Sequence, residues 1–265
     1  MIISIIIPSF NQSQYLEKNF ESILNQSFKE IELIVMDGGS NDGSLDIIKK
    51  YESHLMYWQS EKDGGQSAAI NEGMRRATGE VVTWLNSDDQ LAPNSLKTIS
   101  EYFENNPKCE VLSGLGRRIN VEGRELEVRG AEGLSFDEIL RWKKYLPQSS
   151  CFFRKSLWDK VGGLDESLHF QMDFDLWLRF AQITSFHGID EILSYDLHHD
   201  EAKTVSKSFH KKRLSEYILV LSKYSRERYE EEIGKFCSVY LKVQSVARFL
   251  SRFPGYNAFK RFVQK

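Results

Sequence analysis

Residues 81–89 read VVTWLNSDD, an apolar run that stops at an amide and two adjacent carboxylates, Asp88 and Asp89. A short continuous apolar run is typical of a strand that is buried on both faces. Two unit charges about 4 Å apart repel by roughly 4 kcal/mol in a partly buried site. The stretch is therefore either a polar turn that leaves the core or a site for a divalent cation, because Mg²⁺ and Mn²⁺ prefer carboxylate oxygens.

The same succession of a buried strand and a helix recurs through the N-terminal part. Strands are predicted over residues 2–7, 31–36, 55–59 and 81–85, and a helix follows each of them within the first 105 residues or so. This alternation predicts an α/β fold, a mainly parallel sheet with helices on both faces. Ligands of such sheets bind beyond the carboxyl ends of the strands.

Polar residues follow three of these strands at the point where each strand ends. They are Ser9-Phe10-Asn11, Asp37-Gly38-Gly39-Ser40 and Asn86 to Asp89. We expect them to converge on one rim of the sheet. The stretch DGGSNDGS at 37–44 is not a GxGxxG motif, so it gives little support to a dinucleotide site. Taken alone, it is an ordinary turn that caps the next helix.

The pattern changes after Cys109. The elements predicted there are a hairpin around Glu122-Gly123, a helix from Ser135 to about Trp142, a strand over 151–153, a helix over 173–181, a strand over 192–198, and mostly helix after Thr204. Strands and helices no longer alternate regularly, so this half is predicted to differ from the first in its connections.

The composition is that of a globular protein with a substantial core, since 41% of the residues are hydrophobic and 28% are charged. The three cysteines are far apart and form no CxxC pair, so we expect neither a zinc site nor a disulfide framework, and a reducing cytoplasm is the default location. No segment approaches 20 apolar residues, and the apolar start MIISIIIP is too short for a membrane span.

The charge is distributed unevenly. From Val205 to Lys265 there are 14 Lys and Arg against 5 Asp and Glu, whereas the whole chain has a formal net charge of −3. Residues 242–265 carry basic and aromatic side chains and no acids. They are either an amphipathic helix packed on the domain or an anchor on an anionic membrane. Nucleic acid is not expected as a partner, because the body of the chain is acidic.

Seven stretches together resemble the family 2 glycosyltransferases of the GT-A fold, in particular the non-processive enzymes that build bacterial surface glycans. They are PSFN at 8–11, DGGSNDGS at 37–44, GGQSAAINEGMRRATGE at 64–80, WLNSDD at 84–89, QSSCFFRKSLW, VGGLDESL and MDFDLWLRF. The resemblance implies a GT-A catalytic domain over 1–205, with a nucleotide-binding half at 1–108 and an acceptor-side half at 109–205. A helical, basic extension follows over 206–265.

The resemblance also implies where a nucleotide-sugar donor binds. Asp37 is similar to the acid that hydrogen-bonds the nucleobase, and Asn86 stands where the DxD motif often has its first acid. The other residues implied to line the donor site are Pro8, Ser9, Phe10, Asn11, Asp63, Gly65 and Asn71. An asparagine at position 86 can still donate a hydrogen bond to a ribose or phosphate oxygen.

Asp88 resembles the metal-binding acid of the DxD motif, and His198 resembles a late histidine that completes the coordination. The implied cofactor is Mn²⁺ or Mg²⁺, which bridges the diphosphate of the leaving nucleotide. The adjacent His199 leaves the choice of histidine open. Solvent exposure or packing is the alternative role for either ring.

Asp173 resembles the catalytic base, which takes the proton of the acceptor hydroxyl during an inverting transfer. Its position at the start of a predicted helix is also explained by the preference of acids for helix N-termini, and the two roles are compatible. Gln148, Trp177 and Arg179 are assigned to the acceptor side, although core packing is an alternative for Trp177.

The resemblance thus implies an inverting, metal-dependent transferase that moves a hexosyl or N-acetylhexosaminyl group. The expected donor is a UDP-sugar, and the expected acceptor is a glycan or a lipid-linked glycan at the inner face of the membrane. A homodimer is left open. Two alternatives remain: a nucleotide-sugar-binding relative with impaired catalysis, suggested by Asn86 and by Met172 before the base, and a nucleotidyltransferase.

Overall fold

The computed structural model describes residues 1–130, 134–141, 146–199, 202, 209–225 and 230. Contacts divide the chain into two units, Met1–Phe209 and His210–Lys265. The described part of the second unit contains the helix α8 (His210–Tyr224). The basic segment 242–265 lies outside the described residues. Within the described part of the chain, we find no helix that is both long and apolar enough to span a membrane.

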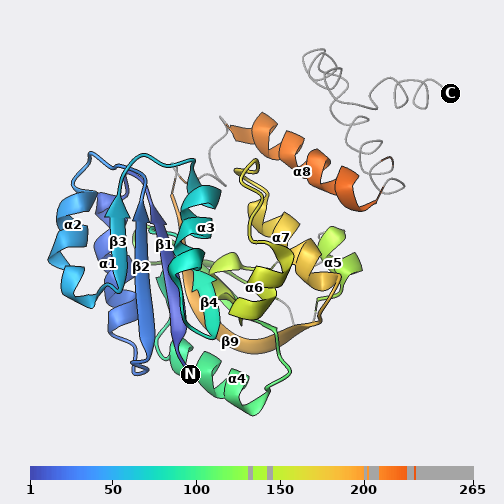
Figure 1. The fold of residues 1–265 in the computed structure, drawn as a ribbon, viewed down its shortest axis with the longest axis horizontal. Helices are drawn as coiled ribbons and strands as arrows, with labels where there is room; N and C mark the ends of the chain where they lie inside the picture. Colours follow the sequence, from blue (N-terminus) through green and yellow to red (C-terminus); the bar gives the residue numbers. More distant parts are fainter. Residues whose placement is uncertain (131–133, 142–145, 200–201, 203–208, 226–229, 231–265) are drawn as a thin grey trace. The chain divides into compact units, whose positions relative to one another are not determined.

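The first unit alternates strands and helices through its N-terminal half (Figure 1). Its elements, in chain order, are β1 (Ile3–Ser9), α1 (Ser13–Leu24), β2 (Ile31–Asp37), α2 (Ser44–Lys50), the 3-10 helix η1 (Glu52–His54), β3 (Tyr57–Ser60), α3 (Gln66–Arg76), β4 (Val81–Trp84), β5 (Gln90–Leu91), α4 (Ser95–Asn105), β6 (Val111–Asn120), β7 (Glu125–Arg129), α5 (Phe136–Leu140), the 3-10 helix η2 (Gln148–Ser150), β8 (Cys151–Arg154), α6 (Lys155–Val161), α7 (Met172–Ala181) and β9 (Phe186–His198).

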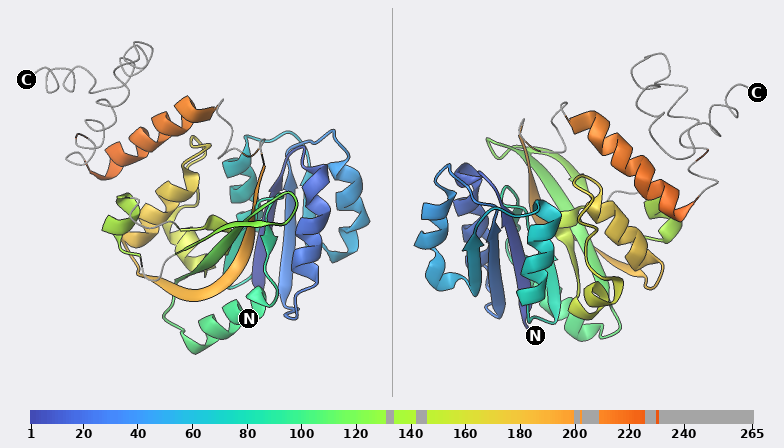
Figure 2. Two further views of the ribbon diagram at one scale, coloured as in Figure 1. Left: turned by 180° about the vertical axis from the view of Figure 1, so that it is seen from behind. Right: turned by 45° about the horizontal axis from the view of Figure 1, so that its top comes forward.

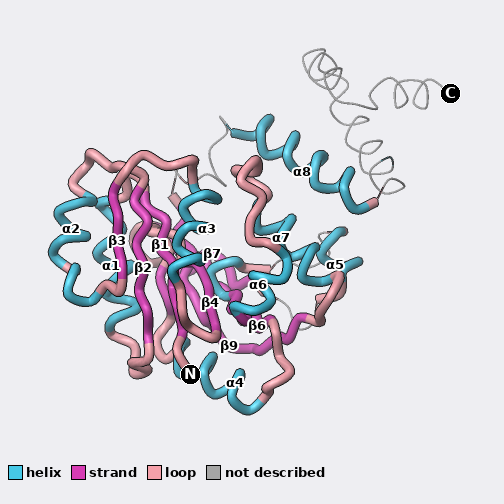
Figure 3. The backbone as a smooth tube through the Cα atoms, viewed as in Figure 1, coloured by secondary structure: helices cyan, strands magenta, loops and turns pink. Residues whose placement is uncertain are grey.

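The nine strands of the described residues belong to one sheet, in the order β3-β2-β1-β4-β8-β6-β9-β5, with β7 paired to β6. Figure 3 draws the strands in magenta. The first four strands of this order are parallel. Strand β8 runs antiparallel to both β4 and β6, while β6 and β9 are parallel. The α/β fold predicted from the alternation is confirmed. The predicted hairpin is also confirmed, as β6 and β7.

The two faces of β1 explain why its sequence is mostly apolar. Ile3, Ile5 and Ile7 belong to a core cluster with side chains of α1, α2 and α4. Ile6 faces the opposite way, where a Cβ added at Gly73 of α3 would lie 2.5 Å from its Cγ2. Figure 2 shows the same layers from other sides. Complete burial of each isoleucine stabilises the fold by about 1.5–3 kcal/mol.

An aromatic cluster joins β4 to the second half of the chain. Trp84 stacks on Trp177 of α7, with ring centroids 5.8 Å apart and an interplanar angle of 13°. Phe153 of β8 stacks on Trp158 of α6 at 5.8 Å. Pairs of this kind are worth about 0.5–1.5 kcal/mol beyond the area they bury. Helix α7 therefore packs against β4, the strand that precedes Asn86.

The strand register brings the carboxyl ends of the parallel strands to one edge. Ser9 lies opposite Asp37, and Asp37 lies opposite Ser60. On the other side of β1, Ile6 lies opposite Trp84. The loops that follow β1, β2, β3 and β4 consequently start from the same rim, as the sequence predicts.

Candidate functional site

The centre of the rim is a contact between Asp88 and His199. Nε2 of His199 lies 3.0 Å from Oδ2 of Asp88, and the side chains are 5% and 21% exposed, respectively. The imidazole also packs against Tyr15 of α1, with ring centroids 4.7 Å apart. The structure thus places His199 beside Asp88. The predicted ligand His198 is the last residue of β9, and its Nδ1 is buried without a hydrogen-bond partner.

Asp89, the neighbour of Asp88, interacts with two further carboxylates, those of Asp88 and Asp196. Burial raises the pKa of the Asp89 carboxyl well above its usual range, and the charges of Asp88 and Asp196 raise it further. Burial also raises the pKa of Asp196, although Ser149 and Ser194 donate hydrogen bonds that favour its charged form. Neighbouring negative charges raise one another's pKa in this way when no cation compensates them. A cation placed here would lower both pKa values.

Asn86 is held by amide groups on both sides. Its Oδ1 accepts a hydrogen bond from Nε2 of Gln66 at 2.8 Å, and its Nδ2 donates to Oδ2 of Asp89 at 3.2 Å. Gln148 donates its Nε2 to the main-chain oxygen of Trp84 at 2.7 Å, and its Oε1 lies 3.5 Å from Nδ2 of Asn86. An aspartate at position 86 has no N–H group to donate to Asp89 and Gln148. The amide is therefore suited to this particular turn.

Asp37 is almost completely buried, with 1% of its surface exposed. Its Oδ2 accepts hydrogen bonds from the N–H groups of Gly39 and Ser40 and from Oγ of Ser60, at 3.1, 2.8 and 2.7 Å. Its Oδ1 accepts from Oγ of Ser40 at 2.5 Å. These contacts show that Asp37 fixes the turn after β2. Its predicted hydrogen bond to the nucleobase is not tested by them, but both oxygens are already engaged.

An exposed aromatic ring and an exposed carboxylate meet around Gly38. A Cβ built on Gly38 would lie 3.2 Å from Cδ2 of Phe10 and 3.3 Å from Oδ2 of Asp63. Phe10 is 60% exposed. Oδ1 of Asp63 accepts a hydrogen bond from the N–H of Gly65 at 2.7 Å, which fixes the carboxylate. A flat ring beside a fixed acceptor is the arrangement that suits a planar base with N–H donors.

The loops that follow β1 and β2 are tied to each other. Asn11, whose φ is 53°, donates its N–H to Oγ of Ser40 and accepts from the N–H of Asn41 with its Oδ1. Asp42 accepts from the N–H groups of Ser13 and Ser44. Burial would raise the pKa of Asp42, but these bonds lower it to about 2. Pro8 and Ser9 are the last two residues of β1, at the base of this loop pair.

Two residues predicted near the donor connect the halves of the domain. Asn71 of α3 donates to the main-chain oxygen of Leu164 at 3.0 Å and accepts from its N–H at 2.9 Å. Gly65, with φ of 103°, precedes α3 and takes a backbone conformation that glycine adopts readily. Asn71 therefore holds the 162–171 segment over α3, which places that segment beside the donor rim.

Asp173 lies in the first turn of α7, and the residue as a whole is half-buried. Burial raises the pKa of this carboxyl, while the N–H of Phe174, which donates to its Oδ1 at 2.8 Å, opposes that rise. A carboxylate with a raised pKa is a stronger base. The site geometry therefore allows the role of general base without testing it.

Trp177 and Arg179 lie in the interior, although both were assigned to the acceptor side. Trp177 is 3% exposed and packs between Trp84 and neighbouring rings. Arg179 donates its Nε to Asp175 and its Nη1 to the main-chain oxygen of Gly163 at 2.6 Å. The surroundings of Trp177 match its core-packing alternative, and Arg179 is half-buried. For both residues, the assignment to the acceptor side stays a prediction.

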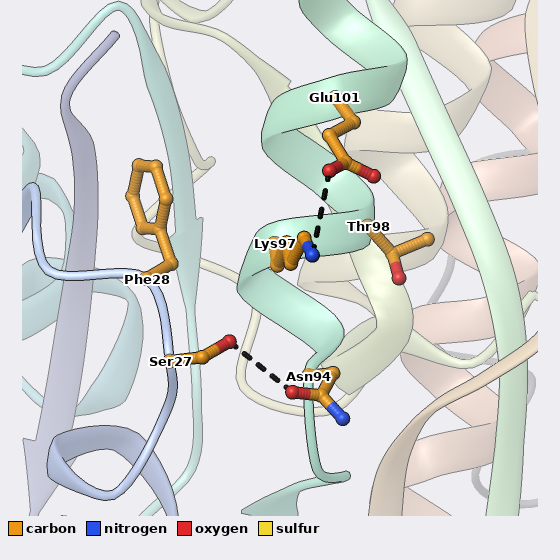
Figure 4. Close-up of a pocket in the computed structure, with 6 residues that line it drawn as sticks. All are labelled: Ser27, Phe28, Asn94, Lys97, Thr98 and Glu101. Carbon is orange, nitrogen blue, oxygen red and sulfur yellow. Dashed lines mark hydrogen bonds and ion pairs between the residues drawn. The ribbon is translucent and has the colours of Figure 1, made fainter.

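An open hollow of about 660 Å³ lies away from this rim. Figure 4 shows it between α4 and the loop that contains Ser27 and Phe28, which leads into the amino end of β2. Ser27 donates its Oγ to Oδ1 of Asn94 at 3.1 Å, and Lys97 pairs with Glu101 on the helix. None of the residues that line the hollow belongs to the loops after β1, β2, β3 and β4. It is not part of the candidate site.

A divalent cation fits the pair of Asp88 and His199. A carboxylate and an imidazole are ligands that Mn²⁺ accepts, and they lie within 3.0 Å of each other on a rigid rim. No third His, Cys, Asp or Glu completes a ready-made cluster among the described residues. The remaining coordination positions would fall to phosphate oxygens and water, as is usual for Mg²⁺-type sites.

Sequence reasoning did not single out several residues of the rim. His199 was left open beside His198, and Asp196, Ser149 and Asp42 were not assigned. The stretch YDLHHDEAKT is rich in polar residues, which does not distinguish Asp196 from its neighbours. The contact of His199 with Asp88 spans 111 positions and has no local signal.

The chain was compared with known proteins. A sequence profile described as glycosyl transferase family 2 matches residues 4–161, which is more than half of the chain. A protein of Mycobacterium tuberculosis named as an uncharacterized glycosyltransferase is 32% identical over 185 residues, or 68% of this chain and 69% of that relative. One of Rickettsia typhi is 27% identical over 239 residues, or 88% of this chain and 74% of the relative.

Solved structures of similar fold are also found. The Staphylococcus aureus protein TarS, residues 1–349, in complex with UDP-GlcNAc, has a TM-score of 0.73 at 18% identity and covers 95% of this chain and 79% of that one. The mannosyltransferase PcManGT of Pyrobaculum calidifontis, in complex with GDP-Man and Mn²⁺, has a TM-score of 0.64 at 13% identity and covers 99% and 84%. At such low identity these likenesses confirm the GT-A type fold. With the profile match, they lead to one assignment: the chain belongs to glycosyl transferase family 2.

Proposed function

We propose that the protein transfers a sugar from a nucleotide-diphosphate sugar, with UDP as the nucleotide, to a hydroxyl group of a glycan or lipid-linked acceptor. The observation that carries the proposal is the pairing of Asp88 with His199 on the rim where the polar loops after β1, β2 and β4 converge. Membership of family 2 supports the reaction class. TarS was solved with UDP-GlcNAc, which supports the choice of donor.

The rim offers a separate place for each part of the donor. The nucleobase would lie on Phe10, with its N–H toward the carboxylate of Asp63. Asn86 and Gln66, whose amides are hydrogen-bonded to each other, would meet the ribose or a phosphate. Asp88 and His199 would hold Mn²⁺ or Mg²⁺ beside the diphosphate. When bound, the cation neutralises the charge that develops on the leaving nucleotide.

Asp173 would take the proton from the acceptor hydroxyl as its oxygen attacks the anomeric carbon. The proton moves to a carboxylate oxygen, the new C–O bond forms, and the bond to the diphosphate breaks. An attack from the side opposite the leaving group inverts the configuration. The raised pKa of Asp173 supports this role, because burial makes it a stronger base. Gln148 lies beside Asn86, and we assign it to the acceptor side.

A surface-polysaccharide role and contact with an anionic membrane belong to the same proposal. A chondroitin synthase of Pasteurella multocida is 23% identical over 232 residues, and the match covers 86% of this chain and 24% of that protein. The basic segment 242–265, to which membrane contact is assigned, lies outside the described residues.

The test is a donor screen with purified protein. UDP- and GDP-sugars are offered with Mn²⁺, binding is followed by calorimetry, and nucleotide release is followed with and without simple glycan acceptors. We expect binding and release with a UDP-sugar, and proton NMR of the product should show inverted anomeric configuration. Failure of every nucleotide sugar to bind would overturn the proposal. Binding without any release would favour the impaired, sugar-nucleotide-binding alternative.

A further inference from the structure

Asp89 has no part in the proposed reaction, yet both of its carboxylate oxygens are engaged. Oδ1 accepts a hydrogen bond from the N–H of Leu197 at 3.2 Å. Oδ2 accepts from Nδ2 of Asn86, also at 3.2 Å. Both partners belong to the protein. The carboxylate of Asp89 is therefore committed to internal contacts, in contrast to that of its neighbour Asp88.

The bond to Leu197 joins two segments that are distant in the sequence. Strand β5 begins directly after Asp89 and pairs antiparallel with β9, with Gln90 opposite Tyr195. The hydrogen bond from Leu197 to the carboxylate of Asp89 extends this pairing by one bond, at the end of β9 nearest His199. Leu197 precedes His199 by two residues. The position of the imidazole thus depends on where this end of β9 is held.

The turn that carries Asp89 is itself anchored. Asn19 of α1 is completely buried and donates its Nδ2 to the main-chain oxygens of Asn86 and Asp89, at 2.9 and 2.8 Å. The N–H of Asp89 donates to the main-chain oxygen of Asn86 at 3.0 Å. Helix α1, the turn and β9 are consequently linked through one short network.

We propose that Asp89 is a positioning residue that holds the C-terminal end of β9 against the 86–89 turn and so keeps His199 at hydrogen-bond distance from Asp88. The inference rests on the proposed function, in which Asp88 and His199 hold the divalent cation. Partners that orient metal ligands typically change metal affinity by roughly 10–100-fold when they are removed. If Asp89 only strengthened the pairing of β5 with β9, its removal would lower the stability of the fold and leave Mn²⁺ affinity unchanged.

Calorimetric titration of Mn²⁺ into the full chain with excess UDP tests the proposal. Asp89→Ala should weaken Mn²⁺ binding by roughly 10–100-fold. The double variant with His199→Ala should bind no more weakly than His199→Ala alone, because Asp89 acts through His199. Asp89→Asn should be intermediate, since its amide oxygen can still accept from Leu197 while its amide nitrogen meets the donor of Asn86. If Asp89→Ala does not fold, the Mn²⁺ affinity of Asp89→Asn tests the proposal instead.

Glu32 provides a matched control at the opposite end of the sheet. Its carboxylate accepts from the N–H groups of Thr78 and Gly79, at 2.9 and 3.2 Å, and from Oγ of Ser4 at 2.6 Å. Glu32→Ala should lower the melting temperature and leave Mn²⁺ affinity unchanged.

Three results would overturn the inference, and they differ in what else they remove. If Asp89→Ala lowers only the melting temperature, or if its loss of affinity adds to that of His199→Ala, Asp89 is a ladder cap and the proposed function stands. If the wild-type protein binds no Mn²⁺ in the presence of UDP, the proposed metal site falls and the inference falls with it.

Discussion

Nε2 of His199 lies 3.0 Å from Oδ2 of Asp88, although 111 positions separate the two residues in the chain. Both side chains are largely shielded from water, the imidazole more so than the carboxylate. A buried imidazole and a half-buried carboxylate are therefore presented together on the rim. Five expected consequences for the site follow, and a sixth concerns the packing beneath it.

His199→Ala should weaken Mn²⁺-dependent UDP binding by roughly tenfold or more, because it removes one of two protein ligands. His198→Ala is the matched control, since the ring that hydrogen-bonds to Asp88 in the structure is that of His199. Calorimetry with UDP in the presence of Mn²⁺ compares the two variants. A loss confined to His198→Ala would show that the wrong histidine has been paired with Asp88.

Asp173→Asn should reduce transfer by about 10²–10⁴-fold, because the amide cannot accept the proton of the acceptor. UDP affinity should remain nearly the same. Asp165→Asn serves as the control, since Asp165 caps the nearby Ser167 through its Oδ1. Turnover and UDP affinity are measured on both variants. Near-normal turnover of Asp173→Asn would remove this residue from the mechanism.

The same substitution should change stability in a pH-dependent way. Because burial raises the pKa of Asp173 in the folded protein, its charged form costs stability at neutral pH. Asp173→Asn should therefore melt at a higher temperature than the wild type at pH 7. This gain should disappear below about pH 3.9, the ordinary pKa of an aspartate, where both states hold the proton. Melting curves across pH 3–8 measure it, and an equal gain at all pH values would argue against a titration of Asp173.

The pH–rate profile provides a separate measurement. A general base must be deprotonated, so activity should fall as the pH drops through the raised pKa of Asp173. The acid limb of kcat should then lie above pH 3.9, the value for an unperturbed aspartate. An acid limb at or below that value would point to another base.

Asp63→Asn should reduce the preference for UDP over CDP. The carboxylate accepts from the N–H of uracil, whereas an amide can also donate to the ring nitrogen of cytosine. Hydrogen bonds to a charged group contribute about 1.5–3 kcal/mol, so UDP affinity should fall by roughly 10–100-fold. Asp37→Asn is compared with it by calorimetry and thermal melting. Because Asp37 is engaged by Ser40 and Ser60, its substitution should mainly lower the melting temperature. The opposite pattern would return nucleobase recognition to Asp37.

Gly73→Ala should destabilise the fold even though alanine favours a helix. The new Cβ would lie 2.5 Å from Cγ2 of Ile6 and 3.2 Å from Cγ of Met36, so α3 would be pushed from the sheet. Overpacking of this kind typically costs about 1–3 kcal/mol, which exceeds the gain of about 1 kcal/mol from helix propensity. Urea denaturation measures the free energy of unfolding of the variant and the wild type. A more stable variant would mean that Ile6 and Met36 shift to make room for the new Cβ.

The N-terminal half was predictable because its signals are local. Strands β1, β2 and β4 are buried on both faces, and their apolar runs could be found without knowledge of their neighbours. Strand β3 is only partly buried and was placed two residues too early at its start. The helix α6 and the two-residue strand β5 were not predicted, because each is short and is stabilised by tertiary contacts.

Strand β9 illustrates what the local pattern could not show. It was predicted from residue 192 but begins at Phe186. Gly188, Asp190 and Glu191 interrupt its apolar pattern, and its pairing with β6 shifts register between Ser113 and Gly116. The continuous strand depends on partners on both sides. A window along the sequence contains no information on those partners.

The site was predictable in outline, and its individual contacts were not. The rule that polar loops gather at the carboxyl ends of parallel strands correctly brought together the segments of Ser9, Asp37 and Asp88. It could not distinguish the exposed Asp63 from the buried Asp37, since both are acids that follow a strand. That distinction depends on which serine and glycine N–H groups lie near each carboxylate after folding.

The place of β9 between β6 and β5 affects how the protein is made. During synthesis, β6 emerges from the ribosome long before β9 and has an open edge until residues 186–198 are available. An unpaired edge can pair with another chain, so a nascent or truncated chain that stops before β9 is prone to aggregate. Strand β9 thus pairs with the open edge of β6 and, in the same step, brings His199 to Asp88. The contact between His199 and Asp88 therefore forms only once β9 has joined the sheet of the first unit.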